Sequence, residues 1–114
     1  MPTLSQQTAS NAAVDAIRNA EDVLTDQIRC STDALTAIKL TNEYNNLDSY
    51  LSELLHAQNA ADDATFANAT KALQSRLSGL EADGKAIQTI ITDVAIAAKV
   101  IGFIANAVKF IAKL

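Results

Sequence analysis

Apolar residues recur every three or four positions along most of the chain, which is the spacing of an amphipathic helix. A first set shares one helical face, whereas a second set, beginning at Leu40, lies half a turn out of phase with it. Either the chain breaks near residues 41–46, where asparagines weaken a helix, or one long helix presents different faces to different partners; we favour an uninterrupted or kinked helix. The first set is Val14, Ile17, Leu24, Ile28, Leu35 and Ile38; the second is Leu40, Tyr44, Leu47, Leu51 and Leu54.

The pattern disappears over residues 56–63 and then resumes for the rest of the chain. We predict a turn there, with Asp62 or Asp63 capping the next helix. From 66 to 112 an alternating four-three register runs without a slip and favours one continuous helix, although Gly79 and Gly84 could instead bracket a loop in which Asp83 caps a new helix. The register comprises Phe66, Thr70, Leu73, Leu77, Leu80, Gly84, Ile87, Ile91, Val94, Ala98, Ile101, Ala105, Val108 and Ala112.

Composition supports a wholly helical fold. The 114 residues are 49% hydrophobic, with one proline, three glycines and no tryptophan, so β-sandwiches and barrels are disfavoured. We therefore predict an all-α protein, an elongated antiparallel helical hairpin or bundle of two long helices, or of the same helices broken into three or four. Residues 1–9 are predicted to be a flexible N-terminus, with Thr8, Ser10 and Asn11 available as caps, and residues 10–114 a single helical-bundle domain.

Charge is divided unequally along the chain. Residues 1–63 carry three basic and ten acidic side chains, whereas residues 64–114 carry six basic and three acidic ones, so the two halves should attract each other in an antiparallel bundle. The dispersed basic residues and the net charge of -4 disfavour nucleic acid as a partner. Cys30 is the single cysteine, so no disulfide forms within the chain, which leaves a disulfide between two copies as the alternative; we expect a buried or half-buried thiol. No cleavable signal peptide is apparent, which predicts a cytoplasmic protein or export by a leaderless route.

Candidate chemical sites are weak. Gly79, Gly84 and Lys85 match most of a phosphate-binding loop, but Ala86 replaces the hydroxyl that would bind magnesium, and a helix precedes the motif where a strand is required. Glu53 and His56 have the spacing of two metal ligands on one helical turn, yet their register turns them to solvent, and one histidine cannot complete a di-iron site. We predict no enzyme activity, no cofactor, no metal and no small-molecule substrate.

The C-terminal segment, residues 94–114, is the most informative. Sixteen of its twenty-one residues are apolar, and Lys99, Asn106, Lys109 and Lys113 form a narrow polar strip. Its longest charge-free stretch, residues 100–108, is too short to span a bilayer, so the segment should be a core helix of a bundle or oligomer, or a helix lying in a membrane interface. A stripe of small residues that includes Ala98, Gly102, Ala105, Ala107 and Ala112 permits close helix approach.

This surplus of apolar surface predicts a non-enzymatic helical interaction or assembly protein that self-associates through its C-terminal helix or binds a helical partner. The predicted interface or membrane face is Ile91, Val94, Ile101, Phe103, Ile104, Val108, Phe110 and Ile111. An alternative function follows from a resemblance: the long acidic helical hairpin with its apolar C-terminal segment resembles subunits of α-helical pore-forming toxins. That resemblance rests on the overall pattern and implies a membrane-active subunit. Independently, the polar strip of the C-terminal helix would turn Lys99, Lys109 and Lys113 toward an anionic surface.

Overall fold

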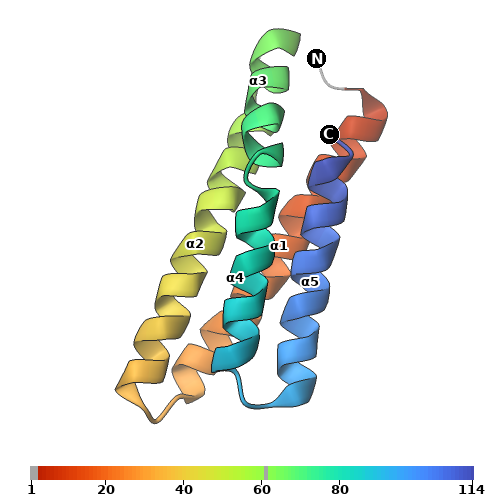
Figure 1. The fold of residues 1–114 in the computed structure, drawn as a ribbon. Helices are drawn as coiled ribbons and strands as arrows, with labels where there is room; N and C mark the ends of the chain where they lie inside the picture. Colours follow the sequence, from red (N-terminus) through yellow and green to blue (C-terminus); the bar gives the residue numbers. More distant parts are fainter. Residues whose placement is uncertain (1–2, 61) are drawn as a thin grey trace.

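The computed structural model describes residues 3–60 and 62–114, which form helices and no strand. The helices are α1 (Leu4–Cys30), α2 (Ala34–Gln58), α3 (Asp63–Gln74), α4 (Leu77–Ile90) and α5 (Val94–Ala112). α3 and α4 follow one another almost end to end, so the molecule is a four-membered bundle of α1, α2, the α3–α4 pair and α5 (Figure 1). It measures 47 × 21 × 20 Å. The predicted all-helical fold is confirmed, whereas the number of helices is larger than the two to four predicted.

Two tight turns made in the same way lie at one end of the bundle (Figure 1). The carboxylate of Asp33 accepts the backbone N–H groups of Leu35 and Thr36, both at 3.3 Å, and begins α2. Asp93 likewise accepts those of Ala95 and Ile96, at 3.0 and 3.2 Å, and begins α5. The local sequences, TDALTAIK and TDVAIAAK, are similar, so one capping solution is used twice.

Neither of the predicted candidate break points interrupts a helix. α2 runs through residues 41–46, and α4 runs through both Gly79 and Gly84, so the alternative in which Asp83 caps a new helix is wrong. The chain breaks instead between Cys30 and Ala34, at Ser75–Arg76, and between Ile90 and Val94, so the favoured uninterrupted helix of the first half and the favoured continuous helix over 66–112 are wrong. The predicted turn before α3 is confirmed, with the carboxylate of Asp62 accepting the N–H of Thr65 at 2.7 Å.

The first helix begins earlier than expected. Thr3 forms a capping box with Gln6, and α1 starts at Leu4, so the caps expected at Thr8, Ser10 or Asn11 are wrong. The side chain of Gln6 also donates to the backbone carbonyl of Leu114 at 3.0 Å. This bond joins the start of α1 to the end of α5, and these two helix ends lie close together (Figure 1).

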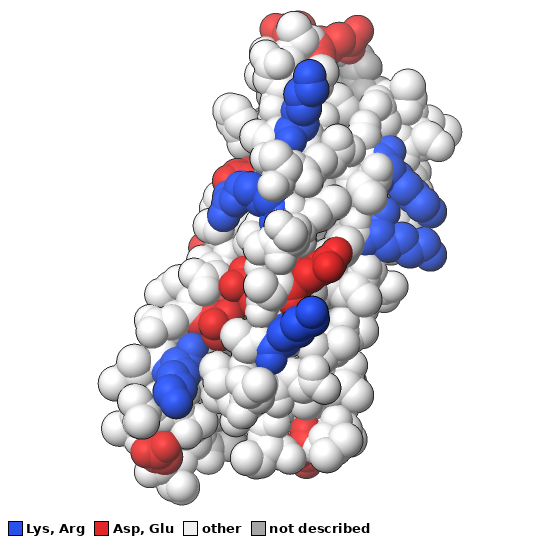
Figure 2. Space-filling view, viewed as in Figure 1, with Lys and Arg blue, Asp and Glu red and all other residues white. Residues whose placement is uncertain are grey.

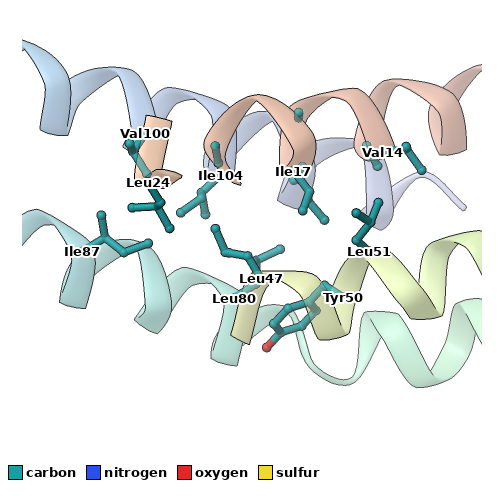
Figure 3. Close-up of a cluster of buried hydrophobic side chains, with 14 of the residues drawn as sticks. Val14, Ile17, Leu24, Leu47, Tyr50, Leu51, Leu80, Ile87, Val100 and Ile104 are labelled. Atoms are coloured by element: carbon teal, nitrogen blue, oxygen red, sulfur yellow. The ribbon is translucent and has the colours of Figure 1, made fainter. Parts of the chain in front are cut away.

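The core fills the space between the four members of the bundle. Large aliphatic side chains from α1, α2, α4 and α5 point toward one another (Figure 3). α4 and α5 approach closely at Gly84, where an added Cβ would lie 3.3 Å from Ile104. The acidic α1 lies alongside the basic α5, and Arg76 forms an ion pair with Glu53 across the two halves of the chain. Fully buried members of the core include Ile17, Leu24, Leu40, Leu47, Leu54, Leu73, Leu80, Ile87, Val100 and Ile111.

Candidate interaction surface

α5 carries two apolar seams, each with alternating spacings of three and four residues. The inner seam is buried in the core and comprises Ala97, Val100, Ile104, Ala107 and Ile111. The outer seam lies about 100° around the helix from the inner one, at 100° per residue. It comprises Val94, Ala98, Ile101, Ala105, Val108 and Ala112.

The outer seam is the final part of the register that the sequence shows from 66 to 112. Before the turn, its members Leu80, Gly84 and Ile87 are buried against the core. After the turn, Val94 is 82% exposed, Ile101 and Val108 are half-buried, and the alanines of the seam are exposed. The reversal of the chain at residues 91–93 therefore turns the same register from the core toward the surface, where the described chain covers Ile101 and Val108 only in part.

A groove between α4 and α5 runs beside the outer seam. It consists of two adjoining hollows of about 520 and 350 Å³, and Gln88, Ile101 and Ala105 line both. Glu81 and Lys85, which are exposed on α4, line the second hollow and form its charged rim. Neither of these two side chains has an ion-pair partner among the described residues. The surface is thus an apolar strip bordered by one acid and one base.

The predicted interface residues divide between core and surface. Ile91, Ile104 and Ile111 are buried inside the bundle and are unavailable to a partner in this conformation. Ile101, Phe103, Val108 and Phe110 are half-buried, and Val94 is exposed.

The polar strip of α5 faces solvent. Lys99, Lys109 and Lys113 are all exposed, and the ammonium groups of Lys109 and Lys113 lie 5.4 and 5.5 Å from the Phe110 ring centroid. Figure 2 shows basic side chains gathered over the C-terminal part of α5. Among the small residues singled out in the sequence, Ala107 is buried and Gly102 is exposed. A Cβ added at Gly102 would have no described heavy atom within 4 Å, so packing inside the chain gives no reason for a glycine there.

Buried carboxyl groups form a second feature, which sequence reasoning missed. Glu21 of α1 is 5% exposed, and its Oε2 has no hydrogen-bond partner among the described residues. Burial, followed by a hydrogen bond with Asp48 of α2 and the charge of Asp48, raises the pKa of Glu21 to about 7. The sequence does contain a signal for this burial: Glu21 lies four residues after Ile17 and three before Leu24, and so occupies an apolar position of the helical pattern.

A second acidic pair lies between α2 and α4. Burial raises the pKa of Glu43, and the charge of Asp83 adds to the shift. Burial also raises the pKa of Asp83, while Arg76 opposes the rise. Acidic side chains cross the middle of the face shown in Figure 2. Burial thus raises the pKa of Glu21, Glu43 and Asp83 above the ordinary values of these acids. The described residues contain no group of three or more potential metal ligands.

The other candidate chemical sites from the sequence do not form a site in the structure. Glu53 pairs with Arg76, whereas His56 is exposed. Gly84 and Lys85 lie within α4 rather than in a loop that could surround a phosphate. Cys30 is an exposed free thiol, so the expectation of a buried or half-buried cysteine is wrong. Its position at the end of α1, beside the turn, explains the exposure.

α5 is, among the described helices, the one long and apolar enough to cross a membrane by length and composition. The short charge-free stretch is therefore not sufficient reason to exclude a membrane-spanning helix. Core helices of soluble proteins meet the same criterion of length and composition. Only 28% of its most apolar window is buried inside the chain. Comparison with protein-family models, curated proteins and solved structures gives no match for this chain.

Proposed function

We propose that this chain is a non-enzymatic helical assembly protein that self-associates through the outer seam of α5. The observation that carries the proposal is the exposure of a second apolar seam, with its adjoining groove, on the most apolar helix of the bundle. A helix with one seam in the core and another on the surface is suited to packing against two neighbours. The described part of the chain buries the inner seam fully but covers the outer seam only in part.

The composition of the outer seam favours a helix as the partner. Ala98, Ala105 and Ala112 recur every seven residues, which allows another helix to approach closely, while Val94 and Ile101 supply larger apolar side chains. Complete burial of a valine or isoleucine side chain stabilises by about 1.5–3 kcal/mol, so Val94 alone has much to gain because it is 82% exposed. A helical partner of another sequence would use the same surface.

Sedimentation velocity over protein concentrations from about 5 to about 500 micromolar tests the proposal, because weak interfaces fall in this range. We expect the mass to rise with concentration for the wild-type chain. Ala105→Gln places a larger polar group in the seam of both copies and should weaken association at least about tenfold, or about 1.4 kcal/mol.

Ala95→Gln is the matched control, because Ala95 is exposed on the same helix but outside the seam. Both substitutions replace an exposed alanine of α5 by the same larger polar side chain, and Ala95→Gln should associate like the wild type because it leaves the seam unchanged. A chain that stays monomeric at the highest concentration, or equal effects of the two substitutions, would contradict the proposal.

A membrane-active subunit is the second candidate, favoured by the length and apolar composition of α5 and by its exposed lysines. In this case α5 would leave the bundle and lie on or in an anionic bilayer. Dye leakage from vesicles of phosphatidylglycerol and phosphatidylcholine tests it. We expect release that weakens when Lys109 and Lys113 are replaced by glutamate, and vesicles that stay intact at every protein concentration would exclude it.

A further inference from the structure

We propose that two copies of this chain pair antiparallel, α5 against α5, about a two-fold axis that crosses α5 at the height of Phe103. The inference rests on the proposed self-association and adds its geometry. Two independent features of the surface point to the same axis: the order of large and small residues along the outer seam, and the order of acid and base along the rim of the groove. The axis lies in the plane of the interface and is perpendicular to the helices, as a closed antiparallel dimer requires.

Size complementarity along the outer seam fixes the direction and the register. The seam alternates a larger residue with an alanine over its whole length. An antiparallel pairing centred at position 103 brings every larger residue opposite an alanine of the second copy, so the side chains interdigitate. The facing pairs are Val94 with Ala112, Ala98 with Val108, and Ile101 with Ala105.

A parallel pairing of the same two helices lacks this complementarity. Each residue would then lie at the height of its own counterpart, so Ile101 would meet Ile101 and Ala105 would meet Ala105. The larger residues would hold the helices apart at the heights where the alanines leave a gap, and gaps forfeit dispersion contacts. The antiparallel arrangement is therefore favoured by packing alone.

The charged rim on α4 is self-complementary about the same axis. A Cβ added at Gly84 would lie 3.3 Å from Ile104 and 3.6 Å from Ile101, so this part of α4 is level with the middle of α5. Glu81 and Lys85 lie on either side of that level, one helical turn apart. The two-fold rotation brings Glu81 of each copy opposite Lys85 of the other. Two ion pairs result, and neither residue has another ion-pair partner among the described residues.

The size of the surface predicts a weak dimer. The outer seam is about 27 Å long at 1.5 Å per residue, and two adjacent helices are about 20 Å wide. The two copies together would bury about 1,000 Å², which is at the low end for a specific interface. We therefore expect a weak dimer in which the charged rim contributes a measurable share of the binding.

Charge exchange between two variants tests the geometry. Glu81→Lys gives a rim with two bases, and Lys85→Glu gives a rim with two acids. In the antiparallel dimer each substitution creates two like-charge contacts, so each variant should self-associate about tenfold more weakly than the wild type. An equimolar mixture should form a heterodimer, in which every acid faces a base, and the double variant with both substitutions should regain wild-type association.

Native mass spectrometry distinguishes the heterodimer from the homodimers, and sedimentation measures their affinities. Asp15→Lys on α1 and Lys39→Glu on α2 are matched charge reversals at exposed positions on other helices, and they should leave association within about twofold of the wild type. Circular dichroism of each variant verifies that the helices are retained.

The outcomes separate the two proposals. Single variants that both associate more weakly than the wild type support the antiparallel dimer, because a parallel dimer already sets Glu81 against Glu81 and Lys85 against Lys85. Recovery of the mixture then shows that the loss is caused by charge. If the wild type associates but the mixture binds no better than its components, the antiparallel geometry is overturned and self-association stands. A wild-type chain that remains monomeric at about 500 micromolar overturns the proposed function together with this inference.

Discussion

Replacement of Glu21 by glutamine should stabilise the bundle at alkaline pH and have little effect at acid pH. The side chain is 5% exposed, and its Oε2 has no hydrogen-bond partner among the described residues. Its pKa is raised from 4.5 to about 7, first by burial and then by Asp48, with a smaller contribution from Asp22; Arg18 opposes the rise. Glutamine has nearly the same shape as the protonated acid but cannot ionise, so it removes the cost of the buried charge.

The sign and the size of the effect follow from proton linkage. Between pH 4.5 and about 7 the folded chain binds more protons at Glu21 than the unfolded chain does, so the free energy of unfolding falls as the pH rises. The penalty is absent below the unfolded pKa and complete above the folded one. The rise in the pKa from 4.5 to about 7 corresponds to at most about 3.4 kcal/mol at pH 8. Relaxation of the α1–α2 contact toward water reduces this, so a gain of about 1–2 kcal/mol is expected.

Urea denaturation followed by circular dichroism at 222 nm measures the effect, with the wild type and Glu21→Gln compared at pH 4.5 and pH 8. The variant should have the higher midpoint at pH 8, and the difference should be nearly absent at pH 4.5. Asp15→Asn is the control, because Asp15 is exposed on the same helix and its carboxyl lies on the surface. If the difference between the wild type and Glu21→Gln is the same at both pH values, the reasoning about the buried carboxyl is wrong.

Two further predictions concern stability, one at the glycines of α4 and α5 and the other at the N-cap of α5. Thermal unfolding measures both effects. Gly102→Ala should stabilise by about 0.5–1 kcal/mol, because the added methyl group meets open space inside an exposed helix; Gly79→Ala should be destabilising by comparison, since its Cβ would lie 2.8 Å from the Tyr50 hydroxyl. Equal shifts in Tm for the two variants would contradict this. Asp93→Ala should cost about 1 kcal/mol, because the cap that begins α5 loses its hydrogen bonds to two backbone N–H groups, whereas Asp93→Asn should retain most of that stability.

Periodicity was sufficient to predict the helices but could not predict where they end. The four-three register passes from Ile87 through Ile91 to Val94 without a slip, because the three-residue spacing between Ile91 and Val94 happens to match the helical pattern. The turn is marked instead by chemistry: Asp93 is a good N-cap residue directly before an apolar run. The same signal at Asp33 was missed for the same reason. Where the signal stood alone, at Asp62, it was recognised and confirmed.

The candidate surface could be predicted in part for a related reason. The sequence indicated that α5 has more apolar area than one hairpin covers, but it assigned Val94, Ile101 and Val108 to the same face as the core residues of α4. The position of the turn between α4 and α5 must be known before the buried face of α4 and the outer seam of α5 can be told apart. The buried carboxyl of Glu21 likewise depends on how α1 and α2 pack, and a helical pattern gives no partner for a single acid among apolar residues.

The two candidate functions place different demands on α5, and the magnitudes favour assembly. Insertion of its apolar face into a membrane requires the inner seam to leave the core, where Val100, Ile104 and Ile111 are at most 3% exposed. Withdrawing three such side chains forfeits about 5–8 kcal/mol, which is comparable with the whole stability of a small domain. Pairing through the outer seam uses surface that is already exposed and leaves the core intact. A membrane role therefore needs a bilayer that compensates the lost core, whereas assembly needs only a sufficient concentration of the chain.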